Sequence, residues 1–511
     1  MITDSRPAAD LDRFRLRTFL SKVAEIGELE TVAGPTQLCD VSARVESSSN
    51  AVLFNDVGPE RYQMVGGVAA SRLRIAAAFG VPPEKAVHEM IRRLANPQGS
   101  VEIASADAPV HAKVITGADI DLTTLPFHLQ HQYDGGLYIS TGIDFTIDPQ
   151  TGRRNIGCRR LMLRSKNTMR ANLTSPSDLK RMLVAATKRG ERLPCTFVVG
   201  SGPLDFLAAT QRISVDEFDL IGALRGEPVP LVNGVTNGIP VPADAEMTIE
   251  GYFDELGHRE LEGPFGEFYG FYGGPHVDPV FHVTAITRRA DVLYQTLVHG
   301  CKVISHADGS HIASMNTEVG AWRALRALRL EPHNIHASPA SNGRPHLRVS
   351  LTDPAPGQAR AVISALFALP VVKQVVVVND DVDVRNDDEV MWATCSRFRA
   401  DRDLVISEAL PANYSDPMSI GRTVAKIGFD CTKDLPPDRP LDDVRAISIV
   451  LSGERRVATL REALADGPRY FSELMVDLGS RDGREIAIEL DGLREAGVLE
   501  RTERGQWYLN G

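Results

Sequence analysis

The sequence lacks any excess of basic charge. Its 511 residues include 56 lysines and arginines against 67 acidic residues, which gives a net charge of -11. A protein that binds nucleic acid over a broad surface needs a basic face to contact phosphates. The charge balance therefore argues against a nucleic-acid scaffold.

Long apolar runs are also missing. No stretch approaches 18 consecutive apolar residues, so we expect no segment that spans a membrane. The first residues, Met1 to Arg6, contain no basic segment followed by an apolar run, which argues against a signal peptide. Internal repeats and low-complexity tracts are absent as well. These features favour a cytoplasmic protein.

Cysteine is scarce and scattered. The six cysteines, at positions 39, 158, 195, 301, 395 and 431, form neither a C-x-x-C pair nor a zinc-binding spacing. We expect reduced thiols, most of which fill protein cores. The content of 43% hydrophobic and 24% charged residues is typical of a globular protein, and the length allows two to four domains.

The order of strand and helix patterns predicts a mixed α/β (α+β) fold in three domains. Residues 1–120 alternate between the two, with helices over 11–30 and 71–79 and a strand over 51–54. Residues 121–318 contain many short strands and two helices, which indicates a β-barrel. Residues 319–452 return to alternation. Helices are expected at 321–330, 358–369 and 389–398, and strands at 346–351, 374–378 and 404–407.

The last segment, residues 453–511, has a different pattern. Helices are expected over 457–464, 470–478 and 484–496, followed by a β-hairpin over 497–509, an order that resembles a winged helix. From Arg455 onward the chain has nine arginines and no lysine against 11 acidic residues. Since this charge would neutralise phosphates poorly, the pattern favours an oligomer or packing contact over DNA binding.

The segment Glu262-Gly263-Pro264-Phe265-Gly266-Glu267 places two carboxylates at the ends of a turn. Pro264 and the glycines exclude a helix, so the loop must bring the carboxylates together if they act at one point. Phe265, Phe268, Tyr269, Phe271 and Tyr272 are expected to form an apolar wall that raises a carboxyl pKa and suits a proton donor and acceptor. An aromatic turn with two solvated acids is the alternative.

Read with three other motifs, this chain resembles the UbiD-like decarboxylases over roughly residues 10–450. The six-residue loop matches that family letter for letter, and Arg160 follows Asn155 at the spacing of the family's catalytic arginine. The supporting matches are 51–54 with Gly66 to Gly80, Leu125-Pro126 leading to 135–139, and 380–383.

The resemblance implies non-oxidative decarboxylation of an aromatic, heteroaromatic or α,β-unsaturated carboxylic acid with prenylated FMN. It implies a catalytic set of Arg160, Glu262 and Glu267, in which Glu267 is the acid and base. The implied flavin-binding residues are Asn155, Ile156, Cys158, Arg159, Arg160, Ser177 and Lys426. From spacing alone, Arg160 would be an ordinary surface arginine and Lys426 a solvated loop lysine.

The resemblance also implies metal ions. Asn155, Asp178 and Glu217 fall on the positions that hold Mn²⁺, with aspartate where the family usually has histidine; aspartate is a hard ligand that suits Mn²⁺ or Mg²⁺. A K⁺ ion would use carbonyl groups of a loop at 206–209. Alternatively, Ser175-x-x-Asp178 and Ser214-x-x-Glu217 fit capping boxes at helix starts.

The implied partners are a small carboxylic acid with CO₂, a flavin prenyltransferase that supplies the cofactor, and further copies of the chain in a homodimer or larger homo-oligomer. Nucleic acid and membrane partners are not expected. Two alternatives come from other classes: a winged-helix regulator that carries a non-catalytic body, and a plain FMN reductase, which would leave the two-glutamate loop without a purpose. No role is assigned to His299, His306 or His311.

Overall fold

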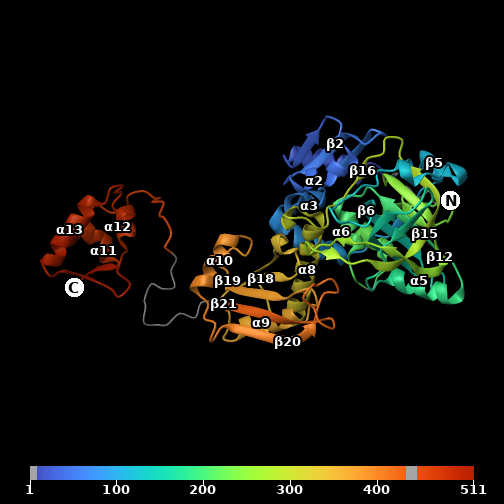
Figure 1. Cartoon of the computed structure of the whole chain (residues 1–511). Coiled ribbons are helices and arrows are strands. Elements are labelled where there is room, and N and C mark those ends of the chain that lie inside the picture. The colour runs from blue at the N-terminus through green and yellow to red at the C-terminus, as the bar shows by residue number, and fades with distance from the viewer. Residues whose placement is uncertain (1–8, 214, 433–445, 511) are drawn as a thin grey trace, which may run out of the picture. The chain divides into compact units, whose positions relative to one another are not determined.

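The computed structural model describes residues 9–213, 215–432 and 446–510. The chain divides into two compact units, Met1–Cys431 and Thr432–Gly511, which are described separately (Figure 1). Among the described residues, no helix is both long and apolar enough to cross a membrane. The predicted domain boundaries within the first unit remain predictions.

The N-terminal region of the first unit is a small sheet with helices beside it. The sheet order is β1 (Leu29–Val32), β2 (Ala51–Val57), β3 (Tyr62–Gly66) and β16 (Tyr294–Gln295). Helix α3 (Arg72–Phe79) lies where the sequence predicts it: Ser71 caps its start, and Gly80 ends it in a left-handed conformation. The other helices are α1 (Leu16–Glu25), α2 (Val41–Glu46) and α4 (Ala86–Leu94).

The central region contains the predicted barrel. Its strands follow the order β12-β9-β6-β7-β8-β15, and antiparallel pairing of β12 with β15 closes six strands into a barrel. Aromatic side chains from three of the strands, Phe197, Phe253 and Phe281, pack edge to face in its core. The strands are β6 (Tyr138–Ile147), β7 (Arg154–Leu163), β8 (Thr168–Ala171), β9 (Leu193–Val199), β12 (Met247–Glu262) and β15 (His276–Arg288), with β5 (Lys113–Thr116) beside β15.

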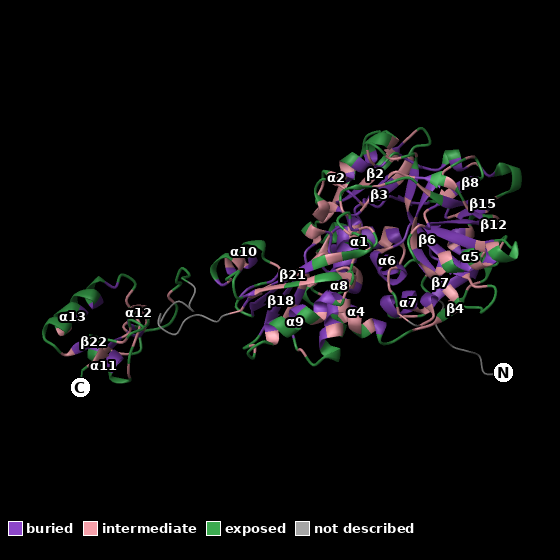
Figure 2. Cartoon of the chain, turned by 60° about the horizontal axis from the view of Figure 1, so that its bottom comes forward, coloured by how far each residue is buried: buried purple, intermediate pink, exposed green. Residues whose placement is uncertain are grey.

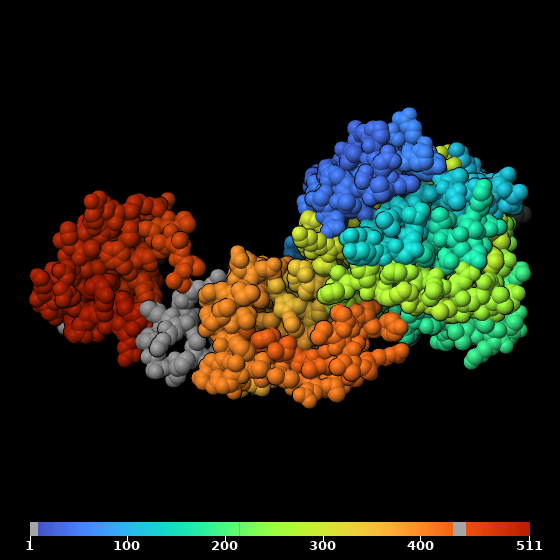
Figure 3. All heavy atoms as spheres, in the orientation of Figure 1, coloured from blue at the N-terminus to red at the C-terminus, as the bar shows by residue number. Residues whose placement is uncertain are grey.

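Three helices accompany the barrel: α5 (Asp178–Arg189), α6 (Pro203–Ala209) and α7 (Glu217–Arg225). A separate small sheet joins β4 (Ser100–Glu102), β10 (Val229–Asn233) and β11 (Pro240–Pro242). In the space-filling view the blue N-terminal residues lie directly against cyan and yellow-green residues of the barrel region, in keeping with the pairing of β16 with β3 (Figure 3). The barrel and the N-terminal sheet are therefore tied together by backbone pairing.

The rest of the first unit is a five-stranded sheet with three helices. The strand order is β17 (Asn334–Ala337), β18 (His346–Leu351), β19 (Gln374–Asn379), β21 (Thr423–Cys431) and β20 (Leu404–Pro411). Helices α9 (Gln358–Phe367) and α10 (Asp387–Ser396) lie close to their predicted ranges. The predicted start of the first helix was wrong: α8 (Asp308–Ala327) begins 13 residues before position 321. Strand β21 was not predicted.

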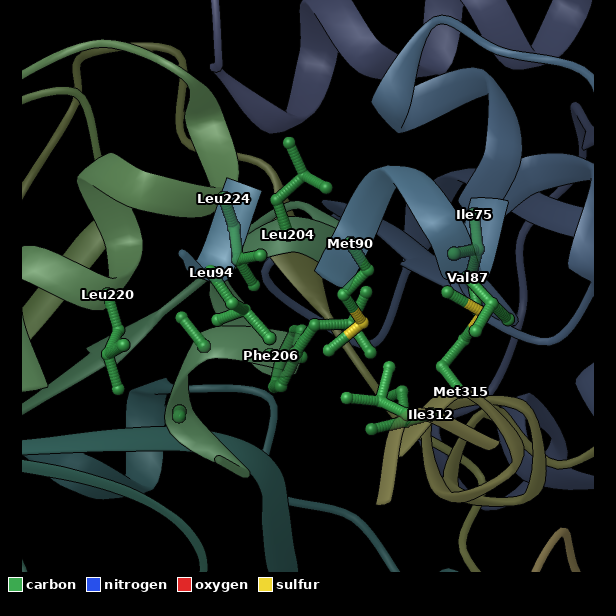
Figure 4. Packing of buried hydrophobic residues seen from close by; sticks show 14 of the residues in the cluster. Ile75, Val87, Met90, Leu94, Leu204, Phe206, Leu220, Leu224, Ile312 and Met315 are labelled. Carbon is green, nitrogen blue, oxygen red and sulfur yellow. The ribbon is translucent and has the colours of Figure 1, made fainter. Parts of the chain in front are cut away.

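One large apolar cluster joins these regions. Figure 4 shows side chains of α3, α4, α6, α7 and α8 packed together, among them Ile75, Met90, Phe206, Leu224 and Met315. Buried segments, drawn in purple, run through the strands and the inner faces of these helices in Figure 2. Because the cluster includes residues from each part of the unit, it holds the barrel against the helices around it.

The cysteines are all free, as predicted, but they fill cores less often than expected. Cys195 and Cys431 are buried, whereas Cys39 and Cys395 are exposed and the other two are partly buried. The prediction that most of them fill cores was wrong.

The second unit consists of helices α11 (Leu460–Ala465), α12 (Phe471–Asp477) and α13 (Arg484–Glu495), then β22 (Leu499–Arg501) paired with β23 (Trp507–Leu509). These elements match the predicted order. They bury an apolar cluster of their own, which includes Leu474, Leu490 and Trp507. Ile488 of α13 is 75% exposed and lies outside this cluster. The assignment as a winged helix remains a prediction.

Candidate active site

Arg160 brings the two loop glutamates together. It lies on β7, and its guanidinium donates two hydrogen bonds of 2.8 Å to the Glu262 carboxylate, from Nε to Oε1 and from Nη2 to Oε2. The remaining amino group, Nη1, donates to Oε1 of Glu267. Arg160 and Glu262 are buried, while the Glu267 side chain is 21% exposed. The two carboxylates therefore converge on one guanidinium, as the loop hypothesis requires.

The local sequence explains how the loop reaches this position. Glu262 ends β12, and Glu267 follows the short strand β13 (Phe265–Gly266), which pairs with β14 (Tyr272–Gly273). The Gly135 amide donates to the carbonyl of Pro264 at 2.7 Å. A Cβ at Gly135 would lie 2.0 Å from the carbonyl oxygen of Gly263, so only glycine allows this approach.

The electrostatics at Glu262 differ from the prediction. Burial disfavours its charge, but the Arg160 guanidinium and His276 lower the pKa of Glu262 to about 2. The expectation of a carboxyl pKa raised by an apolar wall was wrong for this residue. Phe265 instead lies beneath Arg160, with 4.5 Å between the guanidinium carbon and the ring centroid. Two members of the expected wall, Phe271 and Tyr272, are exposed.

A histidine that the sequence analysis missed lies behind Glu262. His276 Nε2 is 3.1 Å from Oε2 of Glu262 and 3.1 Å from Oδ2 of Asp278, and Nδ1 is 2.8 Å from the carbonyl oxygen of Gly274. Hydrogen bonds to Asp278 and Glu262 raise the pKa of His276 to about 10. Nε2 also lies 2.6 Å from Nδ2 of Asn172, but the two carboxylates favour the charged ring. Glu262, His276 and Asp278 could also hold a metal ion by ligand type and spacing. His276 could not be predicted because it reaches Glu262 through the pairing of β12 with β15, which the sequence does not reveal.

His299, to which no role was assigned, lies beside Glu267. Its Nε2 is 3.9 Å from Oε2 of Glu267, and its ring packs edge to face on Phe268. Burial lowers the pKa of His299 to about 4, so the ring is neutral near pH 7. A neutral ring in this position can exchange a hydrogen bond with Glu267 or with a bound molecule.

The three predicted metal ligands also lie together. The Arg153 guanidinium is 3.2 Å from Oδ2 of Asp178 and 3.7 Å from Oε1 of Glu217. Asn155 Nδ2 donates to Asp144 at 3.1 Å, which leaves its side-chain oxygen available. Burial and the nearby Asp178 raise the pKa of Glu217. Since Arg153 supplies positive charge where the two carboxylates meet, this oxygen-rich set fits a divalent cation such as Mn²⁺ or Mg²⁺.

The capping boxes proposed as the alternative are wrong. Helix α5 begins at Asp178 and is capped by Ser177, which accepts a hydrogen bond from the amide of Lys180. Helix α7 begins at Glu217 and is capped by Asp216. Both acids therefore stand at the first position of a helix rather than the third. Ser214, the predicted cap of α7, lies outside the described residues.

The predicted flavin-binding residues gather at β7 and the start of α5, with one exception. The amide of Ile156 donates to Glu217 at 2.8 Å, and Arg159 lies 3.2 Å from both Ser177 Oγ and Asp144 Oδ1. Burial raises the pKa of Cys158 to about 12, so its thiol is uncharged. Lys426 is the exception.

Lys426 is buried in β21 and does not join the other residues. Its ammonium donates to the carbonyl oxygens of Phe367 and Leu369, at 2.8 and 2.7 Å, at the end of α9 and just beyond it. Burial lowers its pKa to about 8. The alternative of a solvated loop residue is wrong, because Lys426 is buried in a strand, whereas contact with the flavin phosphate stays a prediction.

The predicted K⁺ loop is not a loop. Residues 206–209 form the end of α6, and the carbonyl oxygens of Phe206 and Leu207 accept hydrogen bonds from Thr210 Oγ1. A carbonyl oxygen has a second lone pair, so these contacts do not test K⁺ binding, which stays a prediction.

Comparison with known families fits this geometry. Family models described as the N-terminal, Rift-related and C-terminal domains of 3-octaprenyl-4-hydroxybenzoate carboxy-lyase match residues 27–94, 101–302 and 310–431. The anhydromevalonate phosphate decarboxylase of Methanosarcina mazei is 30% identical over 82% of this chain and 96% of its own length. A phenolic acid decarboxylase of a Streptomyces species is 28% identical over 83% of this chain and 93% of its own length.

A solved structure gives the same result. The UbiD-class enzyme HmfF from Pelotomaculum thermopropionicum, in complex with FMN, is 30% identical, with a TM-score of 0.79 over 85% of this chain and 97% of that chain. The family models and these relatives thus identify the chain as a carboxy-lyase. The chain belongs to the UbiD family. The family models end at residue 431, so the second unit lies outside them.

Proposed function

We propose that this chain catalyses the non-oxidative decarboxylation of an aromatic, heteroaromatic or α,β-unsaturated carboxylic acid, with prenylated FMN as cofactor. The observation that carries the proposal is the single guanidinium of Arg160 bound to both Glu262 and Glu267. The relatives named above support it, as does a second HmfF structure, an evolved dimeric form in complex with prFMN. Nothing in the comparisons or in the intact Arg160 cluster supports the regulatory alternative.

The residues of the cluster have different tasks. Arg160, whose charge is secured by the two carboxylates, holds the substrate carboxylate through its planar set of donors. Glu262 is ionised and buried, so it fixes the orientation of Arg160. Glu267 is the more exposed carboxyl and has one bond to Arg160, so it can deliver a proton to the carbon atom that loses CO₂. Prenylated FMN, when bound, supplies the electron-accepting chemistry.

We infer that Asn155, Asp178 and Glu217 hold Mn²⁺ or Mg²⁺ and that Arg159 and Ser177 help to bind the flavin. Each of these three side chains has an oxygen atom that accepts no hydrogen bond from an uncharged group of the described residues. The two carboxylates also lie close to the positive charge of Arg153. A divalent ion would complete the charge balance of this set. K⁺ remains part of the proposal, with the carbonyl oxygens of residues 206–209 at the end of α6 as its ligands.

The proposal implies two partners. A flavin prenyltransferase supplies the cofactor, and the chain forms a homodimer or larger homo-oligomer. The second HmfF structure is that of a dimeric form, which supports an assembly of identical chains here as well.

Co-expression with a flavin prenyltransferase tests the proposal. The purified protein should carry a flavin with the spectrum and mass of prenylated FMN, and it should release CO₂ from members of a panel of aryl and acrylic acids. An R160M variant should lose this activity. E260Q is the control and should retain it, because Glu260 lies on the same strand as Glu262 but pairs with Arg164. Failure of the loaded enzyme to release CO₂ from the whole panel would contradict the proposal.

A further inference from the structure

An arginine beside the catalytic loop has no acidic partner. Arg344 lies in the loop between β17 and β18, and its guanidinium carbon is 4.1 Å from the ring centroid of Phe268, the residue after Glu267. Within the described ranges, 9–213, 215–432 and 446–510, no hydrogen bond or ion pair joins this guanidinium to another residue. Arg160, in contrast, is bound to two carboxylates.

The fold fixes the loop that carries Arg344. Asn342 donates from Nδ2 to the carbonyl oxygen of Phe268, which ties the loop directly to the catalytic segment. Gly343 rests against α8: a Cβ there would lie 2.2 Å from the carbonyl oxygen of Ser310 and 2.4 Å from the amide of Ser314. The backbone that carries Arg344 is therefore fixed on two sides, against Phe268 and against α8.

The surroundings of Arg344 favour an anion. Burial lowers the pKa of Arg344 to about 10, and the nearby Arg212 acts in the same direction. Tyr269 and Glu267 favour its charge, but Glu267 is already bound to Arg160. A partly buried cation without a protein counter-charge gains much from an anionic ligand, because the hydrogen bonds are charge-assisted and can be bidentate.

We propose that Arg344 binds a second anionic group of the substrate. The substrate class is then an acid with two anionic groups: the carboxylate that leaves as CO₂ near Arg160 and Glu267, and a second carboxylate or a phosphate near Arg344. The buried ring of Phe268 lies between Arg344, at 4.1 Å, and His299, at 5.5 Å, so an apolar group separates the arginine from the histidine beside Glu267. This inference rests on the proposed function and narrows its substrate.

A matched set of ligands separates charge from shape. The probes are 4-carbamoylcinnamate, 4-carboxycinnamate and 4-phosphonocinnamate, which share one skeleton and differ at the position far from the reacting carboxylate. The flavin-loaded enzyme should favour one of the two dianions over the carbamoyl compound in kcat/KM by about 10- to 100-fold, the usual value of a hydrogen bond to a charged group. The dianion that is preferred shows whether the second anionic group of the substrate is a carboxylate or a phosphate.

R344M, which keeps the length of the side chain but removes its charge, should reduce that preference ratio to near one, mainly through KM, and R344K should restore part of it. R326M is the matched control, because Arg326 also stacks on an aromatic ring, that of Trp322, at an exposed site. The control should keep the wild-type ratio.

Three results would overturn the inference. One is a wild-type enzyme that converts the carbamoyl compound as well as both dianions, which would leave the proposed function intact. The second is a loss of bound flavin in R344M, which would assign Arg344 to the cofactor phosphate. If the loaded enzyme converts none of the probes, calorimetric titration measures their affinity for the same flavin-loaded protein. Equal affinity for all three probes in the wild type and in R344M would then be the third contradictory result.

Discussion

At the residue scale, Glu267 is the side chain on which the proposed chemistry depends most directly. The substitution E267Q keeps the size of the side chain and one acceptor for Arg160 but removes the acid. We expect turnover to fall by at least ~10²-fold, the usual scale of general acid–base catalysis, with flavin content unchanged. Assays of CO₂ release with E260Q as the control measure this. Turnover close to that of the wild type would remove Glu267 from the mechanism.

His276 gives a prediction about pH. Its pKa is raised from the ordinary 6.5 to about 10 by Asp278 and Glu262, so its contribution to stability is fully present below pH 6.5 and is lost as the pH rises through about 10. The difference in Tm between the wild type and H276Q should therefore be largest near pH 6.5 and shrink toward pH 10. Thermal unfolding at a series of pH values measures it.

The control for His276 is H282Q, which removes a histidine on the same strand that pairs with Asp254 at 2.8 Å, away from the catalytic cluster. If H276Q and the wild type keep a constant Tm difference across this range, His276 is not an imidazolium in the folded protein. In that case Glu262 owes its low pKa to Arg160 alone.

The sequence predicted the site residues that belong to a recognisable motif. It did not predict the residues that reach the site only through the three-dimensional fold. The pair Glu262 and Glu267, with Arg160, was found because the loop and the asparagine–arginine spacing are visible along the chain. His276 and Arg344 carry no motif: one reaches the site through pairing of β12 with β15, and the other through a loop of a different sheet. The expected rise in the pKa of a loop carboxyl failed for Glu262 because ion pairing outweighs burial there.

At the element scale, the start of α5 holds a testable metal ligand. D178A should lower bound Mn²⁺ and flavin together, because it removes one of three oxygen ligands. A helix-terminal acid with no metal would instead cost only about 0.5 kcal/mol through the helix dipole. Metal analysis of the purified protein distinguishes the two cases.

Two further variants define the role of Asp178. D219A is the matched control. Asp219 lies in the first turn of α7, but it pairs with Arg154 and is not one of the proposed metal ligands. It should keep the metal content of the wild type. D178H should retain metal if position 178 is a ligand, because histidine also binds Mn²⁺. Unchanged metal in D178A would exclude Asp178 from the site.

Some helices and strands could be predicted from their local sequence alone. Strand β18 was predicted at its observed bounds, and α3 was predicted from Ser71 and Gly80, because alternation and end signals lie within the segment itself. The first half of α8 was missed because it holds polar residues such as Ser310, His311 and Ser314, which are buried against neighbouring elements rather than set out as an apolar stripe. Strand β21 was missed because Lys426 interrupts its apolar pattern, and its charge is satisfied by carbonyl oxygens far along the chain, those of Phe367 and Leu369.

At the scale of the whole molecule, the second unit is the part without a family model. Its charge does not favour DNA: Arg469, Arg484 and Arg494 each pair with an aspartate of the same unit. Fewer arginines are then available for phosphates than the sequence count suggests. A mobility shift of duplex DNA by the full chain that persists at physiological salt, and is lost on removal of residues 446–511, would overturn this view.

Deletion of residues 446–511 gives the last prediction. The first unit contains every proposed catalytic and metal-binding residue, and the second unit buries its own apolar cluster, so neither core should be opened by the cut. We expect the shortened enzyme to keep its flavin and its CO₂ release, with a change in oligomer mass or solubility that light scattering can measure. L490D, which places a charge in the buried cluster of the second unit, should cause the same change in the full-length chain. A shortened enzyme with unchanged mass and no activity would instead mean that the second unit acts on the active site.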